Sequence, residues 1–367
     1  MATSTLGRVS TSVPKSNAAE GKSALRVRPL APEDQSHWDE FVQGHPQGSP
    51  FHLLAWRNTI EATFRYRPLY CVAVMEGRVR GVLPLFLVKN ILVGKALISS
   101  PFAVYGGALA DSPEVRDAFA QYVRQLAESL RVEYVELRNA HSEQCLGFAS
   151  VSRYITFTQQ IGPDEQVILN SIPRKTRHMV RKGLKANLAT RRQTTEFAAF
   201  EDLYSKNLRR LGTPSFPRKH FANLLANFGA MADIRETRAA DKVVAAVLSF
   251  YFRDQVFPYY GASDPTFNEL APNNFMYYDL MRWGGQNGYR LFDFGRSKKA
   301  GSGSYDFKAH WGMVERELPY EILLVKRQRL PNYSPKNPVF DLPMKLWQHL
   351  PLTLTRKLGP LFLRLVP

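Results

Sequence analysis

Cysteine is scarce in this chain, and only Cys71 and Cys145 occur among 367 residues. Two cysteines so far apart provide neither a metal-ligand spacing nor a disulfide framework, which argues against a small disulfide- or zinc-stabilised fold. This usage fits a reducing compartment, so we expect a cytoplasmic protein. No uninterrupted apolar run of 18 residues occurs, so we expect no transmembrane helix. Residues 1–23 lack the apolar core of a signal peptide and are interpreted as a disordered lead.

Several catalytic signatures are also missing. Asp293-Phe-Gly295 matches the metal-binding triplet of kinases, but no kinase glycine loop or catalytic loop accompanies it. Gly301-Ser-Gly303 does not continue into a dinucleotide fingerprint, and no P-loop, Ser/His/Asp elbow or zinc spacing is present. The sequence therefore argues against a kinase, a nucleotide hydrolase and a serine hydrolase, and we predict neither a metal nor a bound cofactor.

Acidic residues are outnumbered, with 32 Asp and Glu against 49 Lys and Arg, and the net charge is +17. The excess is concentrated in two segments. Residues 166–199 and 322–367 each hold eight Lys or Arg against a single acid, Glu196 and Asp341 respectively. This localisation indicates two surfaces for anionic partners, rather than positive charge spread evenly over the protein for solubility.

The length of the chain and its 44% hydrophobic content suit two domains with sizeable cores. Strands are predicted at 24–30, 69–75, 79–88, 134–137, 243–253, 291–294 and 317–325, among others, and helices at 115–130, 173–185 and 272–288. Each half gives helices, a meander of strands, a helix and a further strand. The pattern predicts an α/β (α+β) fold of two related halves, at 24–162 and 163–328, with a basic amphipathic tail at 329–367.

The segment from Leu291 to Gly312 is the first candidate site. A short strand runs into a Gly/Ser loop with Arg296, Lys298 and Lys299, and the chain returns through Phe307-Lys308 and Trp311-Gly312. Cations on a glycine-rich loop between aromatic anchors suggest a site for an anionic ligand. The alternative is a solvated hairpin with scattered lysines.

Two more segments suggest binding. Arg174, Arg177 and Arg181 share one face of the predicted helix 173–185, where a phosphate partner would relieve their repulsion. Tyr260 ends a predicted strand and Ser263 lies in the turn after it. Asn274 lies at the start of the helix that follows, where unpaired N–H groups favour an anion or a carbonyl. The alternatives are a solvated basic face and ordinary capping beside core tyrosines.

The tail 343–367 interleaves Trp347, Phe362 and leucines such as Leu350, Leu354, Leu358 and Leu365 with Lys345, Arg356, Lys357 and Arg364. This pattern is typical of an amphipathic segment on an anionic membrane surface, which would place the protein at the inner face of the cytoplasmic membrane. The alternative is a tail that packs on its own protein.

Taken in order, the motifs resemble a known family. Ser171-Ile-Pro-Arg-Lys-Thr-Arg-His178, Tyr259-Tyr-Gly-Ala-Ser263, Asp293-Phe-Gly-Arg-Ser297 and Phe307-Lys-Ala-His-Trp-Gly312 are similar to the FemAB-like (Fem-type) branch of the GNAT acyltransferases. Within that branch they are most similar to proteins of exosortase/PEP-CTERM and exopolysaccharide systems. Ser100-Pro-Phe-Ala-Val-Tyr-Gly-Gly107, with Tyr105, resembles a first-half segment of the same proteins.

The resemblance implies two tandem GNAT-like domains, each a mixed, largely antiparallel sheet flanked by helices, with the active site in the second. It implies transfer of an acyl or aminoacyl group to an amine of a cell-wall (peptidoglycan) or exopolysaccharide precursor. The family lysine falls on Lys308, which would stabilise charge with Arg296. Asp293 would orient these cations or act as a base. Substrate contacts are assigned to Tyr105, Arg174, Arg177, Arg181, Tyr260, Ser263, Asn274 and Lys298.

The donor stays open between aminoacyl-tRNA and acyl-CoA. The chain lacks the coiled-coil arm of some tRNA-using relatives, and it also lacks a clear Gln/Arg-x-x-Gly-x-Gly loop for coenzyme A. Three alternatives follow: a sugar-amine N-acyltransferase that uses acyl-CoA, a non-catalytic scaffold for exopolysaccharide synthesis or export, and a nucleic-acid-binding protein. Steep loss of binding with salt would mark the last of these.

Overall fold

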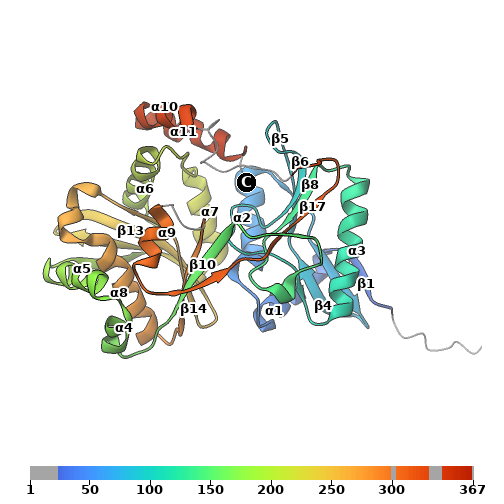
Figure 1. The fold of residues 1–367 in the computed structure, drawn as a ribbon, viewed down its shortest axis with the longest axis horizontal. Coiled ribbons are helices and arrows are strands. Elements are labelled where there is room, and N and C mark those ends of the chain that lie inside the picture. Colours follow the sequence, from blue (N-terminus) through green and yellow to red (C-terminus); the bar gives the residue numbers. More distant parts are fainter. Residues whose placement is uncertain (1–23, 299–302, 330–340, 366–367) are drawn as a thin grey trace, which may run out of the picture.

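The structure is a computed structural model that describes residues 24–298, 303–329 and 341–365, and Figure 1 shows its two halves side by side. The predicted lead 1–23, Lys299 and the tail residues 330–340 lie outside the described residues. The α/β class with mixed sheets and flanking helices is confirmed. Short 3-10 helices occur at Pro32–Asp34, Pro50–His52, Ser142–Gln144, Gly229–Met231 and Pro265–Leu270.

Two sheets make up the first half. One is antiparallel, in the order β1 (Arg26–Pro29), β3 (Cys71–Met75), β4 (Arg78–Leu83) and β7 (Leu109–Ala110). The other has the order β2 (Arg67–Pro68), β5 (Leu85–Asn90), β6 (Gly94–Ser99), β8 (Tyr134–Leu137), β17 (Tyr320–Leu324) and β9 (Ala149–Val151).

Helix α3 (Pro113–Ser129) covers the outer side of these two sheets (Figure 1). Ser112 caps it by accepting a hydrogen bond from the Val115 N–H, and Pro113 occupies its first turn, as helix starts favour. Phe119 and Val123 on its inner face are buried against strand residues such as Leu83. The two remaining helices of this half, α1 (Gln35–Gly44) and α2 (Leu54–Phe64), lie on the inner side.

The second half builds one sheet of seven strands. Its order is β11 (Ala189–Gln193), β12 (Ala232–Ala239), β13 (Lys242–Phe252), β14 (Gln255–Ser263), β15 (Leu291–Lys298), β10 (Tyr154–Gln160) and β16 (Val314–Glu317). All neighbours are antiparallel except β14 and β15. One face carries α4 (Glu165–Ser171), α5 (Arg174–Lys185) and α8 (Pro272–Gln286), and the other carries α6 (Ala198–Arg210) and α7 (Arg218–Phe228).

The halves exchange strands. β10 precedes residue 162 but pairs between β15 and β16 in the seven-stranded sheet. In return, β17 follows β16 and pairs between β8 and β9 in the first half. The predicted boundary at 162/163 therefore separates two parts of the sequence, but each part contributes a strand to the sheet of the other. The predicted domain bounds stay a prediction.

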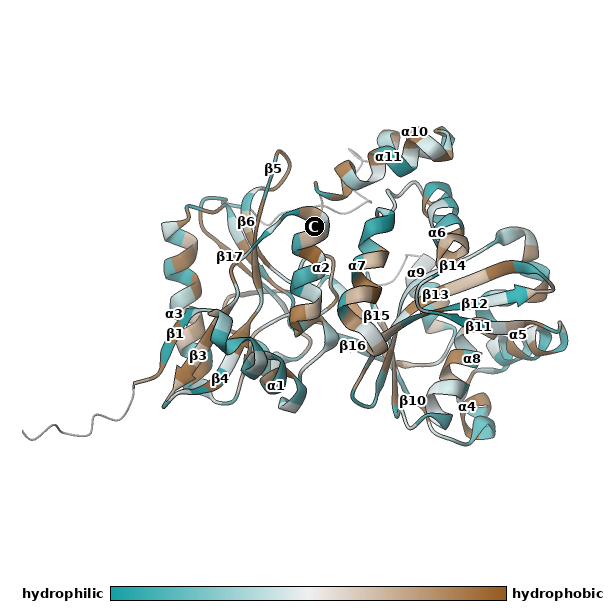
Figure 2. Ribbon diagram, turned by 180° about the vertical axis from the view of Figure 1, so that it is seen from behind, coloured by the Kyte–Doolittle hydropathy of each residue, from teal (hydrophilic) through white to brown (hydrophobic). Residues whose placement is uncertain are grey.

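One apolar core also joins the two halves. Phe51 and Trp56 of the first half place their rings 5.9 and 6.0 Å from the Phe250 ring of β13. Because each aromatic side chain removes a large apolar area from water, this contact gives the halves a fixed relative position. Helices α2 and α7 also lie next to each other (Figure 2), and there Asn223 donates to the Thr63 hydroxyl and Asn227 to the Thr59 hydroxyl, both at 3.0 Å.

Two predicted strands differ from the structure. The predicted strand 79–88 is wrong as a single element, because Pro84 cannot donate a ladder hydrogen bond and the chain changes sheet there, between β4 and β5. The strand predicted at 291–294 continues to Lys298, so Gly295 to Ser297 are strand residues rather than a loop. Strands β6, β10 and β16 and helix α9 (Gly303–Ala309) were not predicted.

The tail forms α10 (Asp341–His349) and α11 (Leu352–Leu363), which lie on α6. Arg356 pairs with Asp202 of α6 at 2.8 Å, and Trp347 is buried. In the part of the chain that the structure describes, no helix combines the length and the apolar character needed to cross a bilayer.

Candidate active site

A β-bulge in β15 brings two predicted site residues to the same side of the sheet. Thr156 of β10 lies opposite Arg296 and Thr158 lies opposite Asp293, so β15 has one residue more than β10 over this stretch. Gly295 adopts φ +65°, a left-handed value that glycine adopts without strain. Residues three apart in a regular strand face opposite sides, whereas here both side chains reach the first half of the chain.

The Asp293 carboxylate is buried and accepts three hydrogen bonds. The donors are the Tyr105 hydroxyl at 2.7 Å, the Thr156 hydroxyl at 3.0 Å and the Gly295 N–H at 2.7 Å. Burial raises the pKa of Asp293, while these bonds and the charge of Lys308 act against that shift. Since Tyr105 belongs to the first half, Asp293 joins the two halves at the bulge.

The Arg296 guanidinium lies among tyrosines from three segments. It stacks over the Tyr154 ring with 4.7 Å to the ring centre, and its Nη1 donates to the Tyr320 hydroxyl at 3.1 Å. The Tyr259 hydroxyl is close enough to interact with its charge. Among the residues that the structure describes, no acidic side chain forms an ion pair with Arg296. A half-buried guanidinium in that condition favours an anionic ligand.

The Lys308 ammonium points back from α9 onto the bulge. Its Nζ donates to the backbone oxygens of Phe294 at 2.6 Å, Gly295 at 3.0 Å and Arg296 at 3.0 Å. Burial lowers the pKa of Lys308 to about 8, partly offset by the Asp293 charge, and Arg296 lowers it further. All three protons of the ammonium are therefore engaged by the strand that carries Asp293 and Arg296.

Two of the recognised motifs pack on each other and hold Lys308 in place. Trp311 is buried, with its ring 5.8 Å from Phe294. The Thr176 hydroxyl of α5 donates to the His310 backbone oxygen at 2.6 Å. Gly312 adopts φ +69°, and a Cβ there would lie 2.8 Å from the Pro173 ring. The start of α5 and the segment 307–312 thus form one unit.

The first-half loop 100–107 closes the site from the other side. Its five consecutive carbonyls from Ser100 to Val104 each accept a side-chain hydrogen bond, from Arg138, Trp56, Tyr259, Arg138 and Tyr320 in that order. Ser100 and Phe102 have positive φ values of 43° and 63°, uncommon for such residues. Donors from both halves therefore hold this loop against Arg296.

The other predicted residues lie on β14, at the start of α8 and at the end of β15. The Tyr260 hydroxyl bonds the His220 Nε2 at 3.0 Å within the shared aromatic core. Ser263 accepts a hydrogen bond from Asn273 at 2.7 Å, beside half-buried Asn274 at the start of α8. Lys298 is the last residue of β15. The structure thus brings Tyr105, Asp293, Arg296 and Lys308 together. It buries Tyr260 against α6 and α7, and it leaves Ser263 and Asn274 where β14 leads to α8.

The predicted basic face lies on α5. Arg174 and Arg181 are exposed, and Arg177 is half-buried and donates to Asn170. Buried Val180 and Gly183 face α8 instead, with Gly183 against Phe275. Since α5 begins next to Gly312, this cationic face extends outward from the edge of the candidate site.

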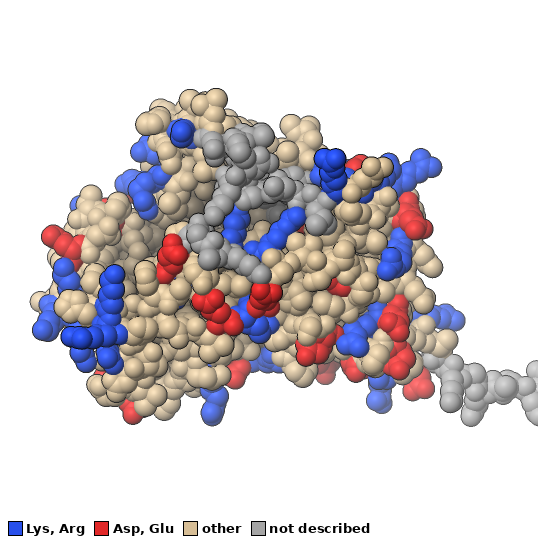
Figure 3. Space-filling model, viewed as in Figure 1, with Lys and Arg blue, Asp and Glu red and all other residues tan. Residues whose placement is uncertain are grey.

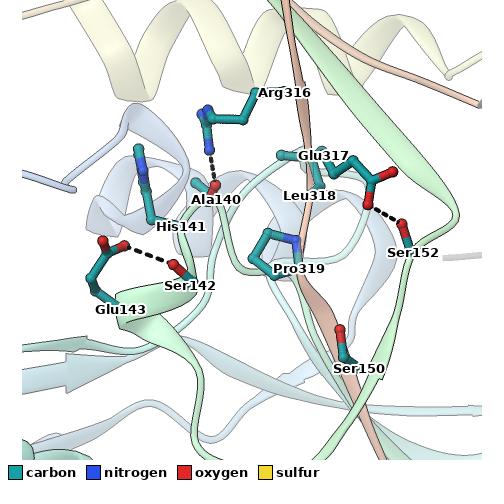
Figure 4. Close-up of a pocket in the computed structure, with 10 residues that line it drawn as sticks. All are labelled: Ala140, His141, Ser142, Glu143, Ser150, Ser152, Arg316, Glu317, Leu318 and Pro319. Atoms are coloured by element: carbon teal, nitrogen blue, oxygen red, sulfur yellow. Dashed lines mark hydrogen bonds between the residues drawn. The ribbon is translucent and has the colours of Figure 1, made fainter.

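A cavity of about 320 Å³ lies between the segments 140–152 and 316–319 (Figure 4). Arg316 of β16 lies opposite Thr156 and donates to the Ala140 backbone oxygen. Burial and then the Arg316 charge lower the pKa of His141, and Glu317 accepts from the Ser152 hydroxyl at 2.5 Å. Lys and Arg side chains also lie in the hollow between the halves (Figure 3).

Sequence reasoning missed Arg138, Thr156, Arg316 and Tyr320. All four reach the site only because strands β10, β16 and β17 and the loop 100–107 come together from distant parts of the chain. Among the described residues, no cluster of metal-binding side chains is found.

Comparisons with known proteins agree with this geometry. Residues 169–309 match the family model described as "Acetyltransferase (GNAT) domain". The fold is similar to the crystal structure of FemX, with a TM-score of 0.66 and 16% identity over 82% of this chain and 98% of that one. A comparison with curated protein sequences found no match.

Two further solved structures share the fold. One is a tandem GNAT protein from the clavulanic acid biosynthesis pathway, with a TM-score of 0.50 and 12% identity over 82% of this chain and 98% of that one. The other is L-PGS from Bacillus licheniformis, with a TM-score of 0.50 and 10% identity over 85% and 97%. The GNAT segment contains Asp293, Arg296 and Lys308, and the tandem fold spans both halves. Residues 169–309 therefore match a GNAT acetyltransferase domain, and the chain as a whole has a fold similar to that of FemX.

Proposed function

We propose that this protein transfers an acyl or aminoacyl group from an ester or thioester donor to an amine of a cell-wall or exopolysaccharide precursor. The observation that carries the proposal is the meeting of the Lys308 ammonium, from α9, with the β15 bulge that carries Arg296, inside the GNAT segment and against the first half. Two cations at one point of a half-buried site suit a reaction that develops negative charge on a carbonyl oxygen.

In the proposed reaction the amine nitrogen attacks the donor carbonyl carbon and a C–N bond forms. The carbonyl oxygen becomes an oxyanion until the C–O or C–S bond to the donor breaks and the leaving group departs. The amine loses one proton in the same sequence. Such a reaction needs orientation, a charged partner for the oxyanion and an acceptor for the proton.

We assign Arg296 to the anionic charge of the donor or of the oxyanion, because it has no acidic partner in the described chain and lies in a tyrosine cage. Lys308 would keep the bulge in shape and would donate to the oxyanion by exchanging one of its three carbonyl partners. Asp293 would orient Tyr105 and Thr156, since both its oxygens already accept hydrogen bonds.

Substrate-binding roles for Tyr105, Tyr260, Ser263, Asn274 and Lys298 remain part of the proposal. Arg174, Arg177 and Arg181 would contact the phosphates of the donor or the acceptor. The exposed positions of Arg174 and Arg181 on α5, next to the segment with Lys308, support this assignment. The cytoplasmic location and the envelope precursor as acceptor are proposed with it.

Donor binding tests the proposal. Calorimetric titrations of the purified protein would use acetyl-CoA, a longer acyl-CoA, a charged tRNA and the same tRNA uncharged. Selective binding of charged tRNA supports aminoacyl transfer, and acyl-CoA binding that is lost in Arg296→Ala supports acyl-CoA-dependent transfer. If no donor binds, or if Arg296→Ala binds as the wild type does, the assignment of this site is wrong. The non-catalytic scaffold would then be the better interpretation.

A further inference from the structure

Exposed hydrophobic residues gather on one edge of the molecule. The large apolar side chains of Leu342, Leu346, Leu354, Leu361 and Phe362 on α10 and α11 are between 38% and 67% exposed, and Ile91 is 94% exposed. These six make up more than half of the ten exposed large hydrophobic residues in the described chain. A gathering of this kind marks an interaction site, whereas single exposed residues do not.

The opposite side of the helix pair is already covered. Trp347 is buried, Arg356 pairs with Asp202, and Arg209 donates to the Leu350 backbone oxygen at 3.2 Å. Gly212 lies against Met344, and Gly359 lies against Ser215. The tail therefore packs on its own protein through one face, which is one of the two alternatives drawn from the sequence. Its other face presents the exposed leucines and Phe362 outward.

Ile91 belongs to the same edge although it is about 250 residues earlier in the chain. It lies in the turn between β5 and β6, and neighbouring Asn90 donates to the Arg364 backbone oxygen at 2.7 Å. The Tyr66 hydroxyl donates to the same oxygen at 3.1 Å. Both ribbon views place the β5 end, α10 and α11 along one edge (Figures 1 and 2).

The charge of this edge has one sign. Residues 342–365 contain Lys345, Arg356, Lys357 and Arg364 and no Asp or Glu, and Lys89 precedes the Ile91 turn. Lys345 and Lys357 are exposed, and no ion pair in the described chain involves them. Arg356 is different, since its charge is used to dock α11 on α6.

We propose that this edge, formed by the turn at Ile91 and the outer faces of α10 and α11, binds the surface of an anionic lipid bilayer. Leu346, Leu361, Phe362 and Ile91 would enter the boundary between headgroups and acyl chains, and Lys345 and Lys357 would contact lipid phosphates. The covered face against α6 keeps the helix pair parallel to the bilayer. This surface is separate from the site on β15, so the proposal does not depend on the donor or on catalysis.

Vesicle flotation tests the proposal, with phosphatidylcholine vesicles compared with vesicles that also contain phosphatidylglycerol. We expect the wild-type protein to float with the anionic vesicles and to be released by salt. The double variant Ile91→Ser/Phe362→Ser should bind about tenfold more weakly or worse, because two inserted apolar side chains are lost. Val167→Ser/Leu184→Ser removes two exposed apolar residues from α4 and α5 and should bind as the wild type does.

Reversing two charges tests the proposed contact of Lys345 and Lys357 with lipid phosphates. Lys345→Glu/Lys357→Glu should weaken binding to anionic vesicles about tenfold or more, since each cation near such a surface contributes to binding. The matched variant Lys175→Glu/Lys182→Glu changes two exposed lysines of α5 and should keep most of the binding. Thermal unfolding of each variant confirms that it is folded, as all these positions are exposed.

The proposal is overturned if the wild type ignores anionic vesicles, or if the α5 variant loses as much binding as the tail variant. It is also overturned if light scattering shows a dimer that Ile91→Ser/Phe362→Ser converts to a monomer without any effect on vesicles. The edge would then be an interface between copies of the chain.

Discussion

Asp293 and Arg296 are three residues apart on β15, and yet both reach the first half of the chain. Asp293 bonds Tyr105 of the first half, and Arg296 bonds Tyr320 of the strand that completes the first-half sheet. The bulge at Gly295 makes this possible, and the Lys308 ammonium holds the carbonyls on both sides of it. The site therefore depends on backbone geometry as much as on side chains.

The bulge can be tested through Gly295. Gly295→Ala places a Cβ at a φ of +65° and 3.3 Å from Val104, so we expect the free energy of unfolding to fall by about 1–2 kcal/mol. The transfer rate should fall as well, because Arg296 would shift. Gly288→Ala is the matched control, since Gly288 has φ +87° with no atom near its Cβ position. It should lose similar stability in urea unfolding and keep its kcat/KM. Equal activity in both variants would contradict the role of the bulge.

Lys308→Met tests the role of the Lys308 ammonium in the reaction and in stability. We expect a loss of kcat of about 100-fold or more, as removal of one oxyanion donor typically causes, with a smaller change in KM. Stability should fall by about 1–3 kcal/mol because buried carbonyls lose a charged donor. Lys308→Arg should recover stability better than activity, since a planar guanidinium cannot reproduce three converging bonds. Lys185→Met on the exposed surface of α5 serves as the control, and full turnover in Lys308→Met would rule out the assignment.

The pKa of Lys308 predicts a pH dependence with a definite sign. Because burial lowers this pKa from 10.5 to about 8, the ammonium loses its proton near pH 8, and kcat should decline above that pH. Between pH 8 and 10.5 the unfolded chain binds one proton more at this residue than the folded chain does. The contribution of Lys308 to the free energy of unfolding therefore rises with pH in that window and is lowest below pH 8.

The measurement is the difference between the wild type and Lys308→Met. Urea unfolding at pH values on both sides of 8 should show a stability difference that changes with pH, and the kcat profile of the variant should lack the alkaline decline. A wild-type profile that is flat through pH 9 would show that the charge of Lys308 is not needed.

The α5 arginines predict a salt dependence. If they contact the phosphates of a single-stranded acceptor end of tRNA, changing Arg174, Arg177 and Arg181 to Gln should reduce the slope of log K against log salt by about 2. Acyl-CoA binding would change far less. The control changes Arg78, Arg124 and Arg131, three exposed arginines of the first half, to Gln. The same slope in both triple variants would mean that α5 does not contact the donor.

Several residues that meet at the bulge were predicted from the sequence. The motif order identified Asp293, Arg296 and Lys308, and the structure brings these three together. The sequence did not predict how they meet, because it suggested a loop after Phe294 where β15 continues to Lys298. Glycine and serine are typical of loops, but a β-bulge stabilised by a buried ammonium makes the same residues part of a strand.

Partners from distant segments could not be predicted. Thr156 lies on β10, for which no strand was predicted, and Tyr320 lies on a strand that crosses to the other half. Tyr260 illustrates the opposite case. Its position at the end of a strand suggested a ligand, whereas its hydroxyl bonds His220 in the shared core.

What the sequence by itself determined is local: the apolar runs that become strands, such as Cys71–Met75, the proline-led helices α3 and α8, and the basic face of α5. Periodicity and capping act within a few residues, so a single sequence carries them in full. Only the tertiary structure decided the strand exchange, the bulge beneath Arg296 and the meeting of Ile91 with the tail. These depend on hydrogen bonds and packing between segments that lie more than a hundred residues apart, such as Asp293 with Tyr105 and Asn90 with Arg364.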